Sequence, residues 1–341
     1  MERQTIVVPG SDRREILFND ELMREVNRFK STLEVIEEEL VFEAGMFSLE
    51  AYQLRIVEEH LEMLGLALGL LLKPEKPIAW VAEDEDGLTL VIMPKMVKEV
   101  LQERVFTQKM PIVFSSATLS LDTSFQYVAD SLGVKSYLSF SVQSPYDYAH
   151  QMELIVPKLK ESDLFTEKMK AAIHLLERTE GRALLLFPSK EELRQFKWAI
   201  AEYPISTSMT IRFEGDQEIS HLISAFQREE NSILCAVTLW EGLDIPGPSL
   251  SNVIIWSLPF PPNDPVYEAK RKAVLNPFEE VDMPYMLLRL RQGIGRLIRS
   301  REDQGIVAIL GQELHYNELV QSRVKEILPT GVEWKELNTC S

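Results

Sequence analysis

Apolar residues recur at spacings of three and four along two stretches near the start of the chain. A period of about 3.6 residues is that of an amphipathic helix. The pattern therefore predicts two helices that pack as an antiparallel hairpin, with Ser48 as a helix cap between them. The apolar positions are Leu22, Val26, Phe29, Leu33, Ile36 and Leu40, then Leu54, Val57, Leu61, Leu64, Leu68 and Leu71.

From about residue 150 onward, short apolar runs alternate with amphipathic stretches. This alternation predicts an α/β fold, a parallel sheet with flanking helices. Right-handed crossovers would bring the loops after Phe187, Val237 and Trp256 to one edge of the sheet, which is the expected working surface. The expected strands are residues 183–187, 209–213, 233–237, 253–256 and 306–310, and the expected helices are residues 190–201, 219–228 and 286–300.

Two further apolar runs, residues 78–82 and 88–92, flank the acidic sequence of residues 83–87. Asp86-Gly87 is a strong turn signal, so the runs predict a β-hairpin. An apolar strand that ends in an acidic pair also has the form of a Walker B motif. None of the 15 glycines is followed by lysine, so a Walker A phosphate loop is absent from this sequence. Without that loop the acidic pair has no partner, and the hairpin is the preferred interpretation.

The stretch of residues 289–301 carries the most informative chemistry. As a helix it would bury one stripe and present two guanidiniums on another face. A glycine inside a helix costs about 1 kcal/mol relative to alanine. Gly293 and Gly295 therefore indicate that a triphosphate or a neighbouring domain approaches the backbone closely. The polar face would hold Gln292, Gly295, Arg296 and Arg299, and the apolar stripe Leu290, Ile294, Leu297 and Ile298.

In chain order, four segments resemble the later motifs of superfamily two helicases, in the form typical of the DinG/XPD-type DNA helicases. Residues 116–118 resemble the coupling motif at the end of the first motor domain, and residues 187–189 resemble the next motif. Residues 240–244, followed by 258–260 and 264–265, resemble the fifth motif, and residues 292–299 the sixth. Asp303 and Gly305 follow at the family's usual distance, whereas Gly311 stands where the family more often has aspartate.

The resemblance implies a RecA-like second helicase motor domain, which would use ATP and Mg²⁺ only together with a first motor domain of the same parent protein. The isolated chain is therefore expected to turn over no ATP. Its nucleic-acid partner would be single-stranded DNA or a DNA fork, contacted through the phosphodiester backbone. The implied roles are arginine fingers for Arg296 and Arg299, orientation of the nucleotide or water for Gln292, ATP binding for Glu241, Gly242, Asp244 and Gly295, coupling for Ser116, Ala117 and Thr118, and DNA binding for Ser189, Thr238 and Trp240.

The same resemblance suggests three segments with a boundary near residue 110. Residues 1–76 would be part of the arch insertion of these helicases. Residues 77–120 would be strands returning to the first motor domain, and residues 121–341 would form motor domain two.

Composition limits the other possibilities. No signal peptide is visible, and the longest apolar stretch, residues 63–72, is too short to cross a bilayer, so we expect a cytoplasmic protein with no membrane partner. Two cysteines cannot supply the four thiolates of an iron-sulfur cluster, and no metal site is expected. The net charge of −17 argues against nucleic acid, but residues 266–301 carry 8 basic against 4 acidic residues.

Two other classes of function remain open from the sequence. One is a non-enzymatic module that binds nucleic acid or protein through the same fold. The other is an unrelated hydrolase that would use Glu241 and Asp244 with His150 or His221. Those histidines have no ligand-like spacing, which favours an ordinary surface or core role for each.

Overall fold

The computed structural model divides the chain into two compact units. The first comprises Met1–Pro111, Asp130–Val134 and Asn263–Pro277, and the second comprises Ile112–Ala129, Lys135–Pro262 and Phe278–Ser341. The structure describes residues 5–7, 13–44, 51–84, 87–94, 97–107, 110–116, 125–203, 205, 209–242, 245, 247 and 249–336.

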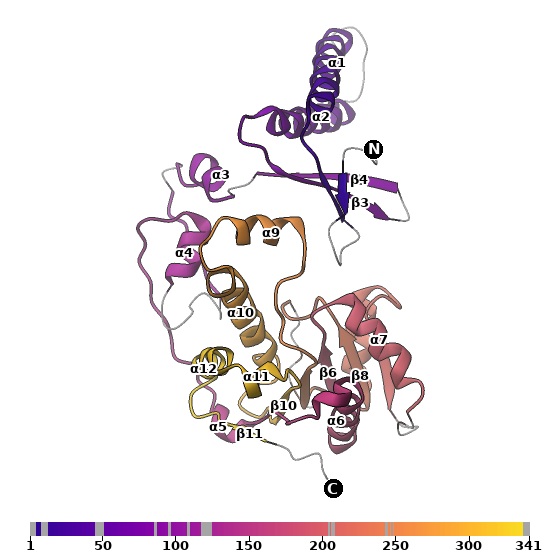
Figure 1. Ribbon diagram of the computed structural model, residues 1–341, viewed down its shortest axis with the longest axis vertical. Coiled ribbons are helices and arrows are strands. Elements are labelled where there is room, and N and C mark those ends of the chain that lie inside the picture. The colour runs from indigo at the N-terminus through magenta and orange to yellow at the C-terminus, as the bar shows by residue number, and fades with distance from the viewer. Residues whose placement is uncertain are drawn as a thin grey trace. The chain divides into compact units, whose positions relative to one another are not determined.

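The second unit is built on a seven-stranded sheet in the order β11-β5-β10-β9-β6-β8-β7 (Figure 1). All its pairings are parallel. The central strands are continuous apolar runs because both of their faces are buried, as is usual in parallel sheets. The strands are Met152–Ile155 (β5), Ala183–Leu186 (β6), Thr210–Phe213 (β7), Ser232–Ala236 (β8), Asn252–Ile255 (β9), Gly305–Ile309 (β10) and Trp334–Lys335 (β11).

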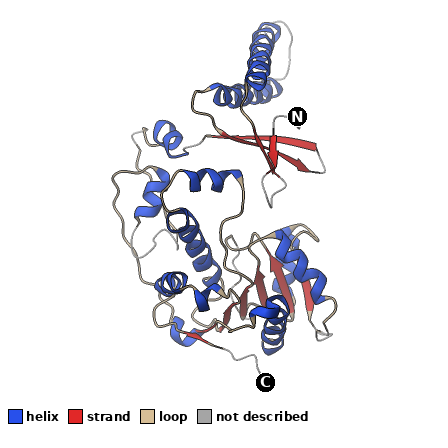
Figure 2. Cartoon of the chain, viewed as in Figure 1, coloured by secondary structure: helices blue, strands red, loops and turns tan. Residues whose placement is uncertain are grey.

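Helices flank this sheet, and two apolar clusters fill the space between them and the strands (Figure 2). Alternate residues of a strand point to opposite faces, so Leu184 and Leu186 join one cluster while Ala183 and Leu185 join the other. The first cluster includes residues of α8, α10 and α12, and the second includes residues of α6 and α7. The helices of this unit are Tyr148–Gln151 (α5), Leu164–Arg178 (α6), Lys190–Ile200 (α7), Ile219–Arg228 (α8), Met283–Ile294 (α10), Glu313–Tyr316 (α11) and Glu318–Ile327 (α12). Gln126–Leu132 (α4) is divided between the two units.

The first unit contains a four-stranded antiparallel sheet in the order β1-β2-β3-β4. The predicted hairpin is confirmed, because β3 and β4 pair antiparallel up to the register Asp84↔Gly87. Both predicted helices form, and they share a core that includes Leu33 and Leu68; Ser48 lies outside the described residues. The elements are Thr5–Val7 (β1), Arg13–Ile16 (β2), Asp20–Ala44 (α1), Ala51–Leu72 (α2), Ile78–Asp84 (β3), Gly87–Met93 (β4), Val97–Arg104 (α3) and Pro265–Lys272 (α9).

The fold class predicted from the sequence is confirmed, but the long helix of the sixth motif is shorter than expected. It was predicted over residues 286–300 and spans Met283–Ile294. Gly295 is its C-cap, and the backbone N–H of Gly295 donates to the Arg291 carbonyl. The apolar pattern continued past this point because Leu297 and Ile298 are buried without being helical.

Two predictions about chain organisation also differ from the structure. Residues 111–116, which end in Ser116, are not assigned to a strand, and β3 and β4 pair with β1 and β2 in a sheet of their own. Asn263–Pro277 was placed in motor domain two but groups with the first unit. Its Asp264 Oδ2 accepts a hydrogen bond from Arg13 Nη1 at 3.0 Å, which attaches this segment to β2.

In the described ranges, no helix is long and apolar enough to span a membrane.

Candidate functional site

The candidate site lies where the crossover from β8 to β9, residues 237–251, runs beside α10. Contacts of the crossover with α10 and with the turn after it follow the same order along the chain. Val237 is bonded by Arg289, Glu241 by Gln292, and Gly247 by Asp303. The crossover is therefore held to α10 and the following turn at three points.

Trp240 anchors the crossover in the core. Its side chain is 1% exposed, and Nε1 donates to the Phe187 carbonyl at the end of β6 at 3.1 Å. A Cβ on Gly293 would lie 3.0 Å from the indole ring. The burial of this ring favours a core role for Trp240 over a contact with a DNA base. The close approach inferred at Gly293 is confirmed, but the approaching group is Trp240 and not a triphosphate.

Three side chains of α10 and its C-terminal end hold the crossover. Arg289 Nη2 donates to the Val237 carbonyl at 2.9 Å, and its guanidinium carbon lies 5.3 Å from the centroid of the Trp240 ring. Gln292 Nε2 donates to Glu241 Oε2 at 3.2 Å. Arg296 donates to the Trp240 carbonyl through Nε at 2.9 Å and Nη2 at 2.6 Å, and it is 7% exposed. In this structure Arg296 is buried and joins the two motifs through these hydrogen bonds.

Arg299 does not share a helix face with Arg296, contrary to the prediction, because the helix has ended. It lies in a turn whose backbone is held from several sides. Its N–H donates to Asp303 Oδ2 at 2.7 Å and its carbonyl accepts from the Tyr146 hydroxyl at 2.7 Å. Gln151 Nε2 donates to the carbonyls of Ser300, Arg301 and Asp303 at 3.1, 3.1 and 2.9 Å. This network fixes the backbone from which the half-buried Arg299 side chain projects.

Asp303 is the main acceptor of this turn. It is 5% exposed and also accepts from Ser300 N–H at 2.7 Å, Ser300 Oγ at 2.9 Å and Gly247 N–H at 3.1 Å. Burial by itself raises the pKa of the carboxyl, but the hydrogen bonds from Arg299, Ser300 and Gly247 outweigh burial and lower the pKa below its ordinary value of 3.8. Asp303 is therefore held as a carboxylate that joins the two motifs.

Glu214, which follows β7, binds the first residues of the crossover. Its Oε2 accepts from the backbone N–H groups of Val237 and Thr238 at 2.6 and 2.9 Å. Both amides are therefore occupied by a carboxylate in this structure. The Thr238 side chain is exposed.

Ser189 is the N-cap of α7 and accepts from Glu192 N–H at 3.2 Å. A polar chain continues from Glu192 to the end of β9. Ser257 Oγ donates to Glu192 Oε2 at 2.6 Å, and Lys168 Nζ donates to Ser257 Oγ at 2.8 Å. Burial lowers the pKa of Lys168 more than the nearby charges of Glu192 and Glu313 raise it. Ser189 thus lies at the carboxyl edge of the sheet, as predicted.

The remaining predicted residues have varied positions. Glu241 and Gly242 are exposed, with Gly242 at a φ of 75°. Gly295 is the C-cap of α10, and Ser116 is exposed. Ala117, Thr118 and Asp244 lie outside the described residues.

The histidines of the hydrolase hypothesis lie at the surface. His150 Nδ1 is 2.8 Å from Asp147 Oδ2, and this hydrogen bond raises the pKa of His150. His221 is 3.9 Å from Glu218. Each histidine pairs with a carboxylate on its own turn, which favours the ordinary surface role.

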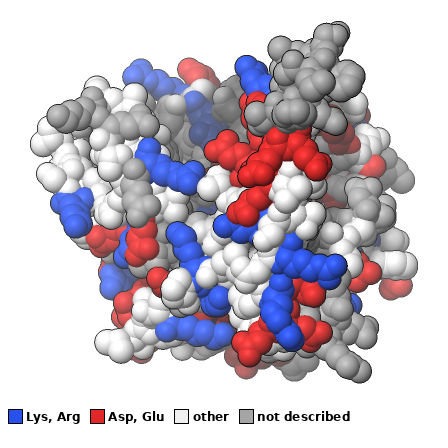
Figure 3. Space-filling model, turned by 90° about the horizontal axis from the view of Figure 1, so that it is seen from above, with Lys and Arg blue, Asp and Glu red and all other residues white. Residues whose placement is uncertain are grey.

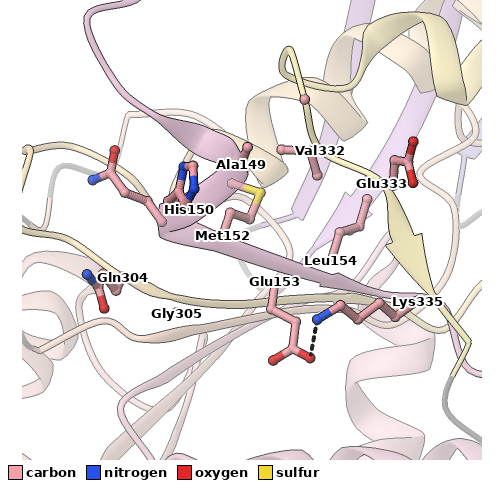
Figure 4. A pocket seen from close by; sticks show the side chains of 12 residues that line it. Ala149, His150, Met152, Glu153, Leu154, Gln304, Gly305, Val332, Glu333 and Lys335 are labelled. Atoms are coloured by element: carbon pink, nitrogen blue, oxygen red, sulfur yellow. Dashed lines mark hydrogen bonds and ion pairs between the residues drawn. The ribbon is translucent and has the colours of Figure 1, made fainter.

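A hollow of about 430 Å³ lies at the amino ends of β5 and β10, the opposite end of these strands from the carboxyl edge (Figure 4). Met152, Leu154 and Val332 give it apolar walls, and an ion pair between Lys335 and Glu153 at 3.4 Å borders it. His150 of the hydrolase hypothesis lines it, but Glu241 does not, and none of the residues of the helicase motifs does. Within the described residues no group of acidic, histidine or cysteine side chains is arranged to hold a metal.

Sequence reasoning missed Glu214, Arg289, Gln151 and Tyr146. Arg289 stood at the start of the analysed motif, three residues before Gln292, and that spacing on a helix was the available signal. Glu214 and Gln151 had no comparable signal, because their partners are 23 and 149 or more positions away.

Comparisons with known proteins show similarity to helicases. The Helicase C-terminal domain family matches residues 172–331. The chain is 49% identical over 324 residues to the Bacillus subtilis protein named "Probable ATP-dependent helicase YpvA", covering 94% of this chain and 49% of that protein. It is 30% identical over 266 residues to the Mycobacterium tuberculosis ATP-dependent helicase DinG, covering 72% of this chain and 40% of that protein. The chain thus spans about half the length of YpvA and a smaller share of DinG.

A solved XPD helicase structure has the same fold. The match has a TM-score of 0.55 at 17% sequence identity, and it covers 96% of this chain and 65% of that chain. From the matched domain, the relatives and the RecA-like sheet, we conclude that the chain belongs to the DinG/XPD-type helicases and corresponds to their C-terminal part.

Proposed function

We propose that the chain supplies the second motor domain of an ATP-dependent DNA helicase. One observation carries the proposal: the sixth-motif helix binds the fifth-motif crossover through Arg289, Gln292 and Arg296, and the next turn fixes Arg299. Such an arrangement can transmit a change at a bound nucleotide to the loop beside it. ATP is the proposed substrate, with this chain contributing one side of its site.

Arg299 is the proposed arginine finger. Its turn is rigidly bonded, and a guanidinium on a fixed backbone costs little reorganisation when charge develops on a γ-phosphate. The burial of Arg296 and its two bonds to the Trp240 carbonyl support a positioning role for Arg296. Glu241, Gly242 and Gly295 are proposed to line the nucleotide side. The chain offers guanidinium and backbone groups that suit phosphates, and the ligands of Mg²⁺ are proposed to come from the first motor domain.

The proposed DNA contacts are Ser189 and Thr238 at the carboxyl ends of β6 and β8. These strands are neighbours in the sheet, and the N-terminus of α7 at Ser189 favours negative charge. On the face drawn in Figure 3, Lys and Arg side chains are interspersed with Asp and Glu. The proposed contacts of Ser189 and Thr238 are with the phosphodiester backbone and would carry no sequence preference.

The proposed partner of the second unit is the first motor domain of the parent protein. Residues 112–114 and 137–142 expose apolar side chains to an extent unusual for a folded domain, up to 102% at Leu138, 84% at Phe140 and 81% at Val142. The alternation at these three positions is that of a strand with one face prepared for burial. Coupling of hydrolysis to movement is proposed for the residues next to the first of these segments, Ser116, Ala117 and Thr118. The helices α1 and α2 of the first unit are proposed to belong to an arch.

The test is steady-state ATPase of the purified chain with oligothymidylate, alone and after joining it to the first motor domain. We expect no turnover from the chain alone and DNA-stimulated turnover from the joined protein. Turnover by the chain alone at the rate of the joined protein would refute the proposal that ATP hydrolysis needs both motor domains. A joined protein that binds DNA without any hydrolysis would favour the binding-module alternative.

A further inference from the structure

Glu214 and Arg289 bind opposite ends of one peptide group, the one that joins Val237 to Thr238. The N–H of this group donates to Glu214 Oε2 at 2.9 Å, and its carbonyl accepts from Arg289 Nη2 at 2.9 Å. A negative charge therefore lies at the positive end of the peptide dipole and a positive charge at the negative end. Both hydrogen bonds are charge-assisted, which makes them stronger than neutral ones.

The backbone of Glu214 and the side chain of Arg289 are themselves fixed. Glu214 follows β7 directly, its N–H donates to the Cys235 carbonyl at 2.9 Å, and Gly215 at a φ of 98° turns the chain away after it. Arg289 stacks over the ring of the buried Trp240 and is bonded to the Tyr285 hydroxyl. The peptide group is thus held between the end of β7 and the middle of α10.

We infer that Glu214 and Arg289 are positioning residues that prevent this peptide group from rotating, and so fix the direction in which the crossover leaves β8. Rotation would place a carbonyl against the carboxylate and an N–H against the guanidinium, which is unfavourable at both ends. Thr238 and the exposed Glu241-Gly242 follow within a few residues. Their placement for DNA and nucleotide therefore depends on two side chains outside the loop, and this consequence rests on the proposed function.

Amide hydrogen exchange on the 341-residue chain tests the clamp directly. Glu214→Ala should speed exchange at Val237 and Thr238 by about tenfold, equivalent to roughly 1.4 kcal/mol, with β6 and β10 unchanged. Glu214→Gln keeps the size and one acceptor oxygen and should fall between. Glu230→Gln, at an exposed carboxylate before β8, is the matched control and should leave exchange unchanged.

Unchanged protection at both amides in Glu214→Ala would overturn the inference. If that variant loses protection throughout the sheet, Glu214→Gln decides, since it must still act on Val237 and Thr238 selectively.

Oligothymidylate affinity, measured by fluorescence anisotropy, distinguishes a positioning role of Glu214 from a purely electrostatic one, because the two roles predict opposite changes in affinity. Removing a negative charge near DNA should tighten binding, whereas loss of positioning should weaken it. We expect Glu214→Gln to weaken binding by about fivefold and Glu230→Gln not to weaken it. Tighter or equal binding by Glu214→Gln would refute the positioning role. If the unmodified chain binds no oligothymidylate, the DNA role of the proposed function fails, while the exchange experiment still decides the clamp.

Discussion

Gly293 and Trp240 fit together so closely that a side chain added at the glycine would press against the indole ring. A Cβ at Gly293 would lie 3.0 Å from two ring atoms of Trp240 and 3.2 Å from Leu186 Cδ1. The indole occupies this space because its Nε1 reaches the Phe187 carbonyl. The glycine of the sixth motif therefore serves the packing of the fifth.

Gly293→Ala should destabilise the second unit by about 1–3 kcal/mol, the usual cost of overpacking a core. Alanine is the better helix former by about 1 kcal/mol, so the clash must exceed this gain. Gly69→Ala in α2 is the matched control, since nothing lies within 4 Å of its Cβ position, and it should be neutral or stabilising. Chemical denaturation followed by tryptophan fluorescence measures both. A Gly293→Ala variant as stable as the control would show that Trp240 can shift freely.

Asp303→Asn should lower stability at neutral pH by roughly 1.5–3 kcal/mol, because an amide replaces a charged acceptor. The pKa of Asp303 is lowered in the folded chain. Its charge therefore contributes stability that is full above the unfolded value near 3.8 and is lost as pH falls through the lower folded value. The difference between the two proteins should shrink on acidification. Glu302→Gln, at the exposed neighbour, should show no such dependence in denaturation at several pH values.

Arg299→Ala, in the chain joined to its first motor domain, should reduce ATP turnover by about 10³-fold or more while nucleotide binding is largely kept. The matched control is Arg301→Ala, two residues away on the same turn and exposed. Turnover and nucleotide affinity are measured separately. Loss of binding with unchanged residual turnover would contradict the role of a finger.

Replacing Leu138 and Phe140 together by serine should make the isolated chain less prone to aggregate. The same change should weaken its association with a separately purified first motor domain by at least about 1 kcal/mol. Leu275→Ser is the control, because Leu275 is also fully exposed, at 101%, but belongs to the first unit. Light scattering and titration calorimetry give the two readouts. Equal association by the serine variant would remove this surface from the proposed interface.

The sequence allowed the sheet to be predicted because short continuous apolar runs alternate with amphipathic stretches, as they do in parallel sheets with flanking helices. The end of α10 could not be predicted in the same way. Leu297 and Ile298 continue the helical spacing, yet they are buried from a turn. Burial produces the same sequence pattern whichever backbone supports it.

For the site, the motifs identified the two segments that meet but not what fixes them. The resemblance implied a finger role for Arg296. Nothing in the sequence indicated that this side chain is buried. The Glu214 contact and the attachment of Asp264 to Arg13 depend on residues brought together only by the completed fold.

The attachment of Asn263–Pro277 to the first unit has a consequence for how such proteins can be shortened. The rings of Phe260 and Phe278, just outside this segment, have their centroids 6.0 Å apart, so its two ends leave the sheet domain almost together. A short linker could replace residues Asn263–Pro277 without changing the order of the strands in the sheet. A truncation that omits Arg13 would remove the hydrogen bond that Asp264 accepts from it, and with it one attachment of this segment to the first unit.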